Sequence, residues 1–258
     1  MNRIAGKRVL ITGASAGIGE ACARTFAASG ANLVLTARRQ DRVDFLAGSL
    51  TRAYGVDVRS YRLDVTDRAA VDAFVEELDG DDLLPDILVN NAGKAVGLDK
   101  LHEGKVEDWE DMIDTNVKGL LYVSRAVLPH MVARNSGHVI NIGSIAGRWV
   151  YPKGAVYNAT KFAVVALTEG MSMDLLGTKV RVSSVDPGMV ETEFSEVRFH
   201  GDTQRARTVY ADTTPLSGDD VADAVLYVAN RPEHVDVFNL VLMPTVQRHA
   251  MLLHREKA

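Results

Sequence analysis

The sequence predicts an α/β protein built on a doubly wound, seven-stranded, mostly parallel sheet with helices on both faces. Two observations lead to this prediction. Short and almost continuously apolar runs alternate with longer stretches of helical periodicity along the whole chain, and the first apolar run ends in a glycine-rich turn. Apolar strands of this kind are typical of a parallel sheet whose two faces are both covered.

The predicted elements follow one another in a regular order. The first strand, residues 8–12, precedes the glycine-rich turn and a helix at 17–29 that Gly30 can end. Further strands are expected at 32–36, 58–63, 87–89, 137–142, 180–185 and 237–243, and further helices at 41–54, 67–78, 107–134, 155–176 and 219–229. With right-handed crossovers, this alternation gives the Rossmann fold.

The 258 residues are expected to form one domain over positions 1–258, because no linker, repeat or low-complexity segment interrupts the pattern. One stretch breaks the rhythm of strands and helices. Residues 190–217 are polar, mixed in charge and long for a connection inside a domain. Connections of this length are usually functional, so we expect this segment to be a substrate lid.

Composition excludes several classes of protein. A formal net charge of −5 offers no electrostatic footprint for nucleic acid or for an anionic membrane. The single cysteine, Cys22, excludes an intramolecular disulfide and fits a reducing compartment, and no signal or membrane-spanning run is visible. The histidines are dispersed, which argues against a His/Cys metal site. A cytoplasmic protein without a metal is the expectation.

The turn after the first strand carries glycines at Gly13, Gly17 and Gly19, a GxxxGxG spacing. Glycines there let the backbone approach a pyrophosphate, and the following helix N-terminus offers free N–H groups. An ordinary turn would also explain the glycines. Their place between a strand and a helix favours a dinucleotide.

The end of the second strand reads Thr36-Ala37-Arg38-Arg39. An acid usually stands there to bind the ribose diol of NAD(H). Arg38 and Arg39 would instead pair with a phosphate, so the sequence predicts NADP(H). The alternative is a solvated arginine pair at the end of a strand.

Tyr157 and Lys161 lie four positions apart, on one face of a predicted helix. Ser144 follows the fifth strand, at the end of the sheet where open α/β proteins place their ligands. Each residue alone has an ordinary structural explanation. Together they indicate a site that exchanges protons with a small alcohol or carbonyl compound.

At this point the chain resembles the short-chain dehydrogenases/reductases. The matching pieces are Thr12-Gly13-xxx-Gly17-x-Gly19, Asp64-Val65, Asn90-Asn91-Ala92-Gly93, Asn116, Ser144, Tyr157-xxx-Lys161 and Pro187-Gly188, in the order and spacing of that family. The resemblance implies a catalytic tetrad of Asn116, Ser144, Tyr157 and Lys161. It implies cofactor contacts from Gly13, Ser15, Gly17, Ile18, Gly19, Asp64, Val65, Asn91, Ala92, Gly93, Tyr157, Lys161, Pro187, Gly188, Val190 and Thr192. It also implies a homotetramer.

Physical chemistry agrees with the implied roles. A tyrosine exchanges protons poorly near neutral pH because its reference pKa is about 10. A cation such as Lys161 stabilises the phenolate of Tyr157 and lowers that pKa. Ser144 can hold the substrate oxygen for hydride transfer. That Asn116 holds a water linked to Lys161 is implied by the resemblance alone.

Three segments carry a narrower resemblance. Residues 106–116, 193–199 and 241–247 are similar to NADP-dependent 3-hydroxy acid dehydrogenases, which oxidise serine, allo-threonine and related acids and reduce malonic semialdehyde. Sulfoacetaldehyde reductases are similar as well. Leu242-Met243-Pro244 stands where many members of the wider family have a glycine-rich ending.

The implied substrates share a small anion, and arginine is the best partner for a buried anion. We expect Arg198, within the 190–217 segment, to contact it, with Arg148 as the alternative. Either arginine could equally be a surface residue. Two other functions stay open: a sulfoacetaldehyde reductase, and a non-catalytic NADP(H)-binding regulator on the same fold.

Overall fold

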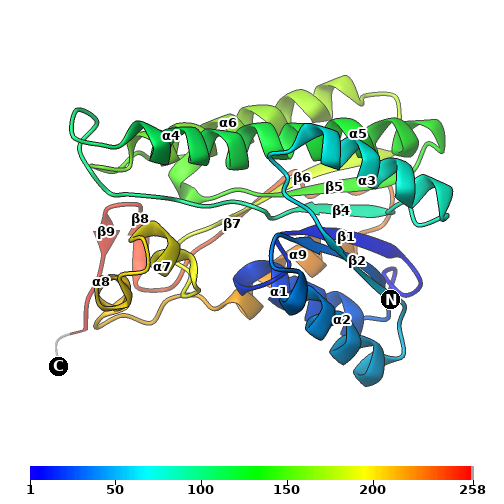
Figure 1. The fold of residues 1–258 in the computed structure, drawn as a ribbon, viewed down its shortest axis with the longest axis horizontal. Coiled ribbons are helices and arrows are strands. Elements are labelled where there is room, and N and C mark those ends of the chain that lie inside the picture. Colours follow the sequence, from blue (N-terminus) through cyan, green and yellow to red (C-terminus); the bar gives the residue numbers. More distant parts are fainter. Residues whose placement is uncertain (257–258) are drawn as a thin grey trace.

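The computed structural model describes residues 1–256 and shows one seven-stranded sheet with the strand order β3-β2-β1-β4-β5-β6-β7 (Figure 1). The strands are β1 (Arg8–Thr12), β2 (Asn32–Ala37), β3 (Val58–Arg62), β4 (Ile87–Asn90), β5 (Gly137–Ile142), β6 (Val180–Pro187) and β7 (Asn239–Leu242). Each neighbouring pair is parallel. The predicted doubly wound sheet is confirmed, and the strand order reverses between β1 and β4.

Helices cover both faces of this sheet, as Figure 1 shows. The helices α1 (Gly17–Ala28), α2 (Gln40–Tyr54) and α9 (Gly218–Ala229) lie on one face, and α3 (Arg68–Gly80), α4 (Val106–Ile113), α5 (Leu120–Ala133) and α6 (Ala155–Asp174) lie on the other. Successive strand residues alternate between the two apolar cores. Val9 and Ile11 pack with the first layer, whereas Leu10 packs with the second. Burial on both faces explains why the central strands β1 and β4 are mostly apolar, whereas the edge strand β3 is partly exposed and more polar.

The predicted helical stretch at 107–134 is confirmed as an unbroken run from Val106 to Ala133, but its geometry is not uniform. A π-helical segment, Asp114–Gly119, separates α4 from α5. At its end Gly119 lies against Val65, where an added Cβ would come within 2.6 Å of the valine Cγ2. The wider turn also places Asn116 in the protein interior. Short π segments of this kind are frequent at functional sites.

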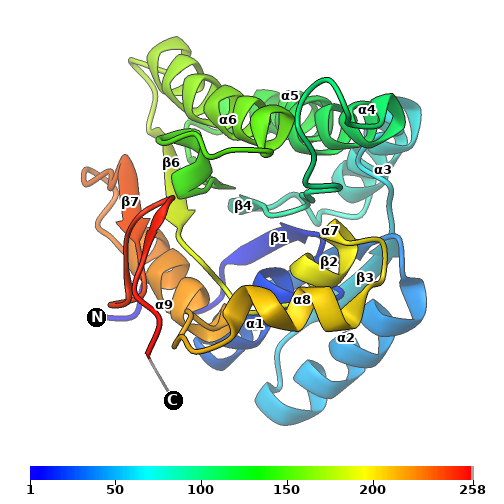
Figure 2. The same cartoon turned by 90° about the vertical axis from the view of Figure 1, so that its left-hand side faces the viewer.

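The segment 190–217 is less irregular than its composition suggested. It contains two short helices, α7 (Phe194–Arg198) and α8 (Thr203–Tyr210). They lie at one end of the sheet together with a small antiparallel hairpin, β8 (Gln247–His249) and β9 (Leu252–Leu253), as Figures 1 and 2 show. Within residues 1–256, no helix combines the length and apolarity that crossing a membrane would need.

His138 on β5 is buried, and its protonation should make the stability of the fold depend on pH. Its Nε2 lies 2.7 Å from the Ser183 hydroxyl, and burial lowers its pKa well below the usual value. The unfolded chain takes up a proton near pH 6.5, whereas the folded chain resists it, so stability falls as pH drops below that value. Between pH 8 and 5.5 we expect this histidine to cost about 1 kcal/mol of unfolding free energy.

Urea unfolding of the wild type and of His138→Gln at both pH values checks this. The wild type should lose more stability on acidification than the variant, which has no proton to take up at this site. An equal loss in both proteins would contradict the burial argument.

Candidate active site

A cleft of about 970 Å³ runs along the carboxyl ends of the strands. It is lined by the turns after β1, β2, β4, β5 and β6, together with the 190–217 segment and the β8–β9 hairpin. The cleft therefore spans the place where the strand order reverses between β1 and β4. That is where doubly wound sheets bind their ligands.

The glycine-rich turn has the geometry of a dinucleotide cradle. Gly13 and Gly17 have φ values of +67° and +57°, which side chains other than glycine rarely adopt. A Cβ at Gly19 would lie 2.4 Å from the carbonyl oxygen of Gly13, so α1 packs closely under the turn. The backbone N–H groups at the N-terminus of α1 are therefore not covered by side chains. Helix N-termini of this kind are suited to binding a pyrophosphate. The turn fits the predicted cofactor.

The two arginines after β2 face this cleft. The Arg39 guanidinium donates from Nε and Nη2 to the Ser15 hydroxyl, at 3.2 and 3.1 Å. Arg38 lies 4.0 Å from the carboxylate of Asp64, and both arginines line the cleft. Two cations beside the phosphate loop fit an adenosine ribose that carries a 2′-phosphate.

Most of the residues predicted to bind the cofactor line this one cleft. These are Gly13, Ser15, Gly17, Ile18, Arg38, Arg39, Asp64, Val65, Asn91, Ala92, Gly93, Tyr157, Lys161, Pro187, Gly188, Val190 and Thr192. Gly19 lies beneath the turn, where it permits the close packing already described. The Asn91 amide donates to the carbonyl oxygens of Thr12 and Gly13, at 2.9 and 3.1 Å, and thereby fixes the turn from below.

Tyr157 lies in the first turn of α6 and is almost fully buried. Burial and the neighbouring Tyr151 raise the pKa of its phenol above the ordinary value, whereas the Arg198 guanidinium and the Ser144 hydroxyl lower it. The hydroxyl groups of Tyr157 and Ser144 therefore belong to one site, at the end of the cleft away from Arg39. A buried phenol with a strongly shifted pKa in a cleft is a candidate for proton exchange.

Lys161 follows one helical turn later and points to the same place. Its Nζ donates to the carbonyl oxygen of Ile142, at 2.9 Å, and lies 6.0 Å from the centre of the Tyr157 ring. Burial lowers the pKa of this amine to about 8, against the opposing charge of Asp186. Ser144 is held at the end of β5 by a hydrogen bond from the Ala146 amide.

Asn116 lies behind these residues. Its Oδ1 accepts from the Lys94 amide at 2.8 Å, and its Nδ2 donates to the Lys94 carbonyl oxygen and to the Thr160 hydroxyl. These bonds tie the π segment to the turn after β4 and to α6. The Oδ1 would be only 3.3 Å from a Cβ at Gly93, a residue that does line the cleft. Asn116 is thus adjacent to the site and fixes its floor.

The two arginines proposed for the substrate anion lie in different surroundings. Arg198, at the end of α7, lines the cleft with its guanidinium carbon 5.2 Å from the centre of the Tyr157 ring. The alternative, Arg148, lies outside the lining of this cleft and already has partners of its own. Its Nε donates to the buried Asp186 at 2.9 Å and its Nη2 donates to Asn239, so this guanidinium holds β6 and β7 together.

Three residues near the reacting end were missed from the sequence. Tyr151 accepts a hydrogen bond from Arg198, and the Phe194 ring packs edge-on against Tyr157 with centroids 5.8 Å apart. Tyr151 lies outside the helices and strands, and Phe194 begins a helix of only five residues, so neither is marked by a periodic pattern. Lys94 lines the cleft and pairs with Asp111. Its place directly after Asn90-Asn91-Ala92-Gly93 was a signal that could have identified it.

The comparisons with known proteins agree with this geometry. The chain is 48% identical over 249 residues to an NADP-dependent 3-hydroxy acid dehydrogenase of Salmonella typhi, covering 96% of this chain and 99% of the relative. It is 45% identical to sulfoacetaldehyde reductase 2 of Chromohalobacter salexigens, covering 93% and 94%. A closed form of serine dehydrogenase complexed with NADP+ superposes with a TM-score of 0.89 at 47% identity, covering 96% of this chain and 100% of that one.

These relatives confirm the predicted oxidoreductase and its cofactor, NADP(H). The family model of the short chain dehydrogenases matches residues 7–203. That range includes the glycine-rich turn, Ser144, Tyr157, Lys161 and Arg198. The protein therefore belongs to the short-chain dehydrogenase family.

Proposed function

We propose that this protein interconverts a small 3-hydroxy acid, of the serine, allo-threonine or 3-hydroxypropionate type, with its semialdehyde or ketone. Asn116, Ser144, Tyr157 and Lys161 form its catalytic tetrad in this proposal. The segment 190–217 acts as the substrate lid.

The observation that carries the proposal is the position of Arg198. Its guanidinium carbon lies within 6 Å of the rings of Tyr157, Tyr151 and Phe194, at 5.2, 5.6 and 5.9 Å. Its Nε is buried and has no hydrogen-bond partner within residues 1–256. A buried donor without a partner is costly, and a bound carboxylate would satisfy it.

The substrate size follows from this spacing. In a 3-hydroxy acid, one carbon separates the carboxylate from the carbon that carries the hydroxyl. A carboxylate on Arg198 would therefore leave the hydroxyl beside the neighbouring Tyr157, against which the guanidinium rests. The aromatic wall of Tyr151 and Phe194 limits the length of the chain. Longer or uncharged alcohols would lack either room or an ionic partner.

The proton chemistry then falls to this chain's own groups. NADP(H), when bound, supplies or accepts the hydride. In alcohol oxidation, the Tyr157 phenolate oxygen takes the hydroxyl proton while Ser144 holds the substrate oxygen by a hydrogen bond. In carbonyl reduction, the phenol returns that proton. Lys161, held on the Ile142 carbonyl oxygen, stabilises the phenolate in either direction.

A second candidate is a sulfoacetaldehyde reductase. Sulfoacetaldehyde also carries its anion one carbon away from the carbonyl carbon, so Arg198 would serve it equally well. The 45% identity to a protein named for that activity favours keeping this candidate. Parallel assays with malonic semialdehyde and sulfoacetaldehyde, with NADPH and with NADH, separate the two. The larger kcat/KM identifies the preferred anion.

The Arg198→Ala variant tests the proposed substrate class. We expect KM for 3-hydroxypropionate to rise about 10- to 100-fold, because a charge-assisted contact is lost. For the uncharged methyl ester of the same acid, KM should change little. Steady-state oxidation of both compounds with NADP+ provides the measurement.

Arg207→Ala is the matched control, because Arg207 lies on α8 of the same segment and is exposed to solvent. It removes the same charge without touching the cleft, so KM for both compounds should stay near the wild-type value. Equal changes for acid and ester in Arg198→Ala would contradict an anion contact at Arg198.

A further inference from the structure

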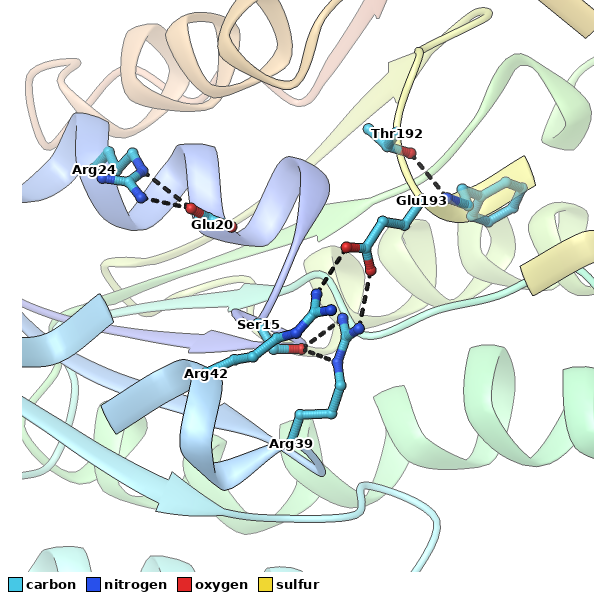
Figure 3. Close-up of polar contacts among 8 residues, drawn as sticks. Ser15, Glu20, Arg24, Arg39, Arg42, Thr192 and Glu193 are labelled. Carbon is cyan, nitrogen blue, oxygen red and sulfur yellow. Dashed lines mark hydrogen bonds and ion pairs between the residues drawn. The ribbon is translucent and has the colours of Figure 1, made fainter. Parts of the chain in front are cut away.

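A carboxylate from the lid lies at the cofactor end of the cleft, among the arginines. Glu193 accepts from Arg39 Nη1 at 2.9 Å through one oxygen and from Arg42 Nη1 at 2.7 Å through the other, as Figure 3 shows. Arg39 follows β2 and Arg42 lies in the first turn of α2, whereas Glu193 immediately precedes α7. The two ion pairs therefore connect the lid to the opposite wall of the cleft.

The Arg39 guanidinium has two partners at once. It donates to the Ser15 hydroxyl in the glycine-rich turn and to Glu193 on the lid (Figure 3). The neighbouring lid residue, Thr192, lies against the same turn. A Cβ added at Gly17 would be 3.2 Å from the Cβ of Thr192. Glu193 thus lies beside Ser15 and Arg39, the groups that fit a 2′-phosphate. The carboxylate of Glu193 therefore lies where the negatively charged 2′-phosphate would bind.

The exposure of these side chains to solvent bears on whether Arg39 and Arg42 would prefer the carboxylate of Glu193 or a phosphate. The side chains of Arg39, Arg42 and Glu193 are 44%, 45% and 43% exposed, and ion pairs this open to water stabilise a fold very little. A phosphate monoester carries about 1.5 to 2 negative charges and three acceptor oxygens, more than a carboxylate offers. The arginines therefore lose little by leaving Glu193 for a phosphate. An ionised Glu193 that remained nearby would repel that phosphate.

Glu193 is ionised whenever this competition matters. Its hydrogen bonds from Arg42 and Arg39 hold its pKa below the usual range. A cofactor without a 2′-phosphate would meet no such competition, because it brings no anion to Arg39 or Arg42. The contact thus distinguishes the two nicotinamide dinucleotides.

We propose that Glu193 is a specificity-determining residue that competes with the 2′-phosphate of NADP(H) for Arg39 and Arg42. The inference rests on NADP(H) as the cofactor. Binding of the 2′-phosphate displaces Glu193 from the two arginines. NAD(H) leaves both ion pairs in place. Glu193 thereby limits how tightly NADP(H) is held.

Binding of two adenosine ligands to the full-length protein tests the competition without turnover. The ligands are 2′,5′-ADP and 5′-AMP, which differ by the 2′-phosphate, and calorimetry gives their Kd values. In Glu193→Gln, we expect 2′,5′-ADP to bind about fivefold tighter, because one negative charge near the phosphate is gone. The Kd of 5′-AMP should not change.

Glu196→Gln is the matched control. Glu196 lies on the same lid helix, is exposed, and makes no ion pair within residues 1–256, so the same change of charge should leave both Kd values near wild type. An unchanged or weaker Kd for 2′,5′-ADP in Glu193→Gln would overturn the competition. If the wild type itself showed no preference for 2′,5′-ADP over 5′-AMP, the NADP(H) assignment would fail, and this inference with it.

Discussion

Replacing Tyr157 with phenylalanine should lower kcat by about 10²- to 10⁴-fold in both directions, because the variant has no oxygen to give or take the proton. The ring would still fill its place against Phe194, whose centroid lies 5.8 Å away. The buried site keeps its packing, and the variant should fold. Steady-state rates with a 3-hydroxy acid and NADP+, and with a semialdehyde and NADPH, give the two values of kcat.

Binding separates catalysis from cofactor recognition in this variant. Arg39 and the glycine-rich turn lie at the other end of the cleft, so the Kd of NADPH should stay within a few-fold of wild type. Tyr227→Phe removes the same hydroxyl group from an exposed position on α9 and should leave kcat unchanged. If Tyr157→Phe kept more than about a tenth of wild-type kcat, Tyr157 would not be the acid–base group.

This pair of measurements also addresses the non-catalytic alternative. A regulator on this fold would bind NADPH and turn over no small hydroxy acid or aldehyde, even as the wild type. Wild-type turnover that disappears in Tyr157→Phe, with NADPH binding intact, would exclude it. The buried phenol with Ser144 beside it argues for an enzyme.

Replacing Lys161 with glutamine should lower kcat/KM for alcohol oxidation by about 10²-fold or more, because the phenolate loses the cation that stabilises it. The direction of the pH effect follows from the same charge. In the proposed mechanism Lys161 favours the phenolate of Tyr157, so oxidation by the variant should begin at higher pH than in the wild type. The measurement is kcat/KM against pH for both proteins.

The amine itself adds an alkaline limit. Burial lowers the pKa of Lys161 to about 8, so this residue is charged below pH 8 and neutral above it. Carbonyl reduction by the wild type should therefore decline above about pH 8, where the charge beside the phenol is lost. Lys118→Gln, which removes an exposed lysine from the π segment, should keep the wild-type profile. The same profile in Lys161→Gln and the wild type would contradict the role of Lys161.

Patterns within short stretches of sequence were sufficient to predict the fold, the glycine-rich turn and the Tyr157–Lys161 pair. Strands buried on both faces are rich in apolar residues, so β1, β2 and β4 to β6 could be recognised from their composition. Gly13 and Gly17 occupy positive φ in a turn whose place between β1 and α1 was visible beforehand. Tyr157 and Lys161 share a helix face whatever the remainder of the chain does, because helix geometry sets that spacing.

Contacts between distant segments could not be predicted in this way. Arg148 and Arg198 were equivalent as arginines, and only the pairing of β5 with β6 and of β6 with β7 brings Asp186 and Asn239 to Arg148. Asn116 was expected inside a continuous helix. It lies in a π-helical segment, where its side chain bonds to Lys94 and to Thr160 in other parts of the chain.

Thus the sequence by itself determined the doubly wound sheet, the dinucleotide turn and the Tyr157–Lys161 pair, because short-range periodicity and backbone geometry are sufficient for each. The tertiary structure alone decided which arginine lines the cleft, where Asn116 lies, and that Glu193 reaches across the cleft to Arg39 and Arg42. Those outcomes depend on charge pairing and packing between residues far apart in the chain, and such contacts exist only once the fold has formed.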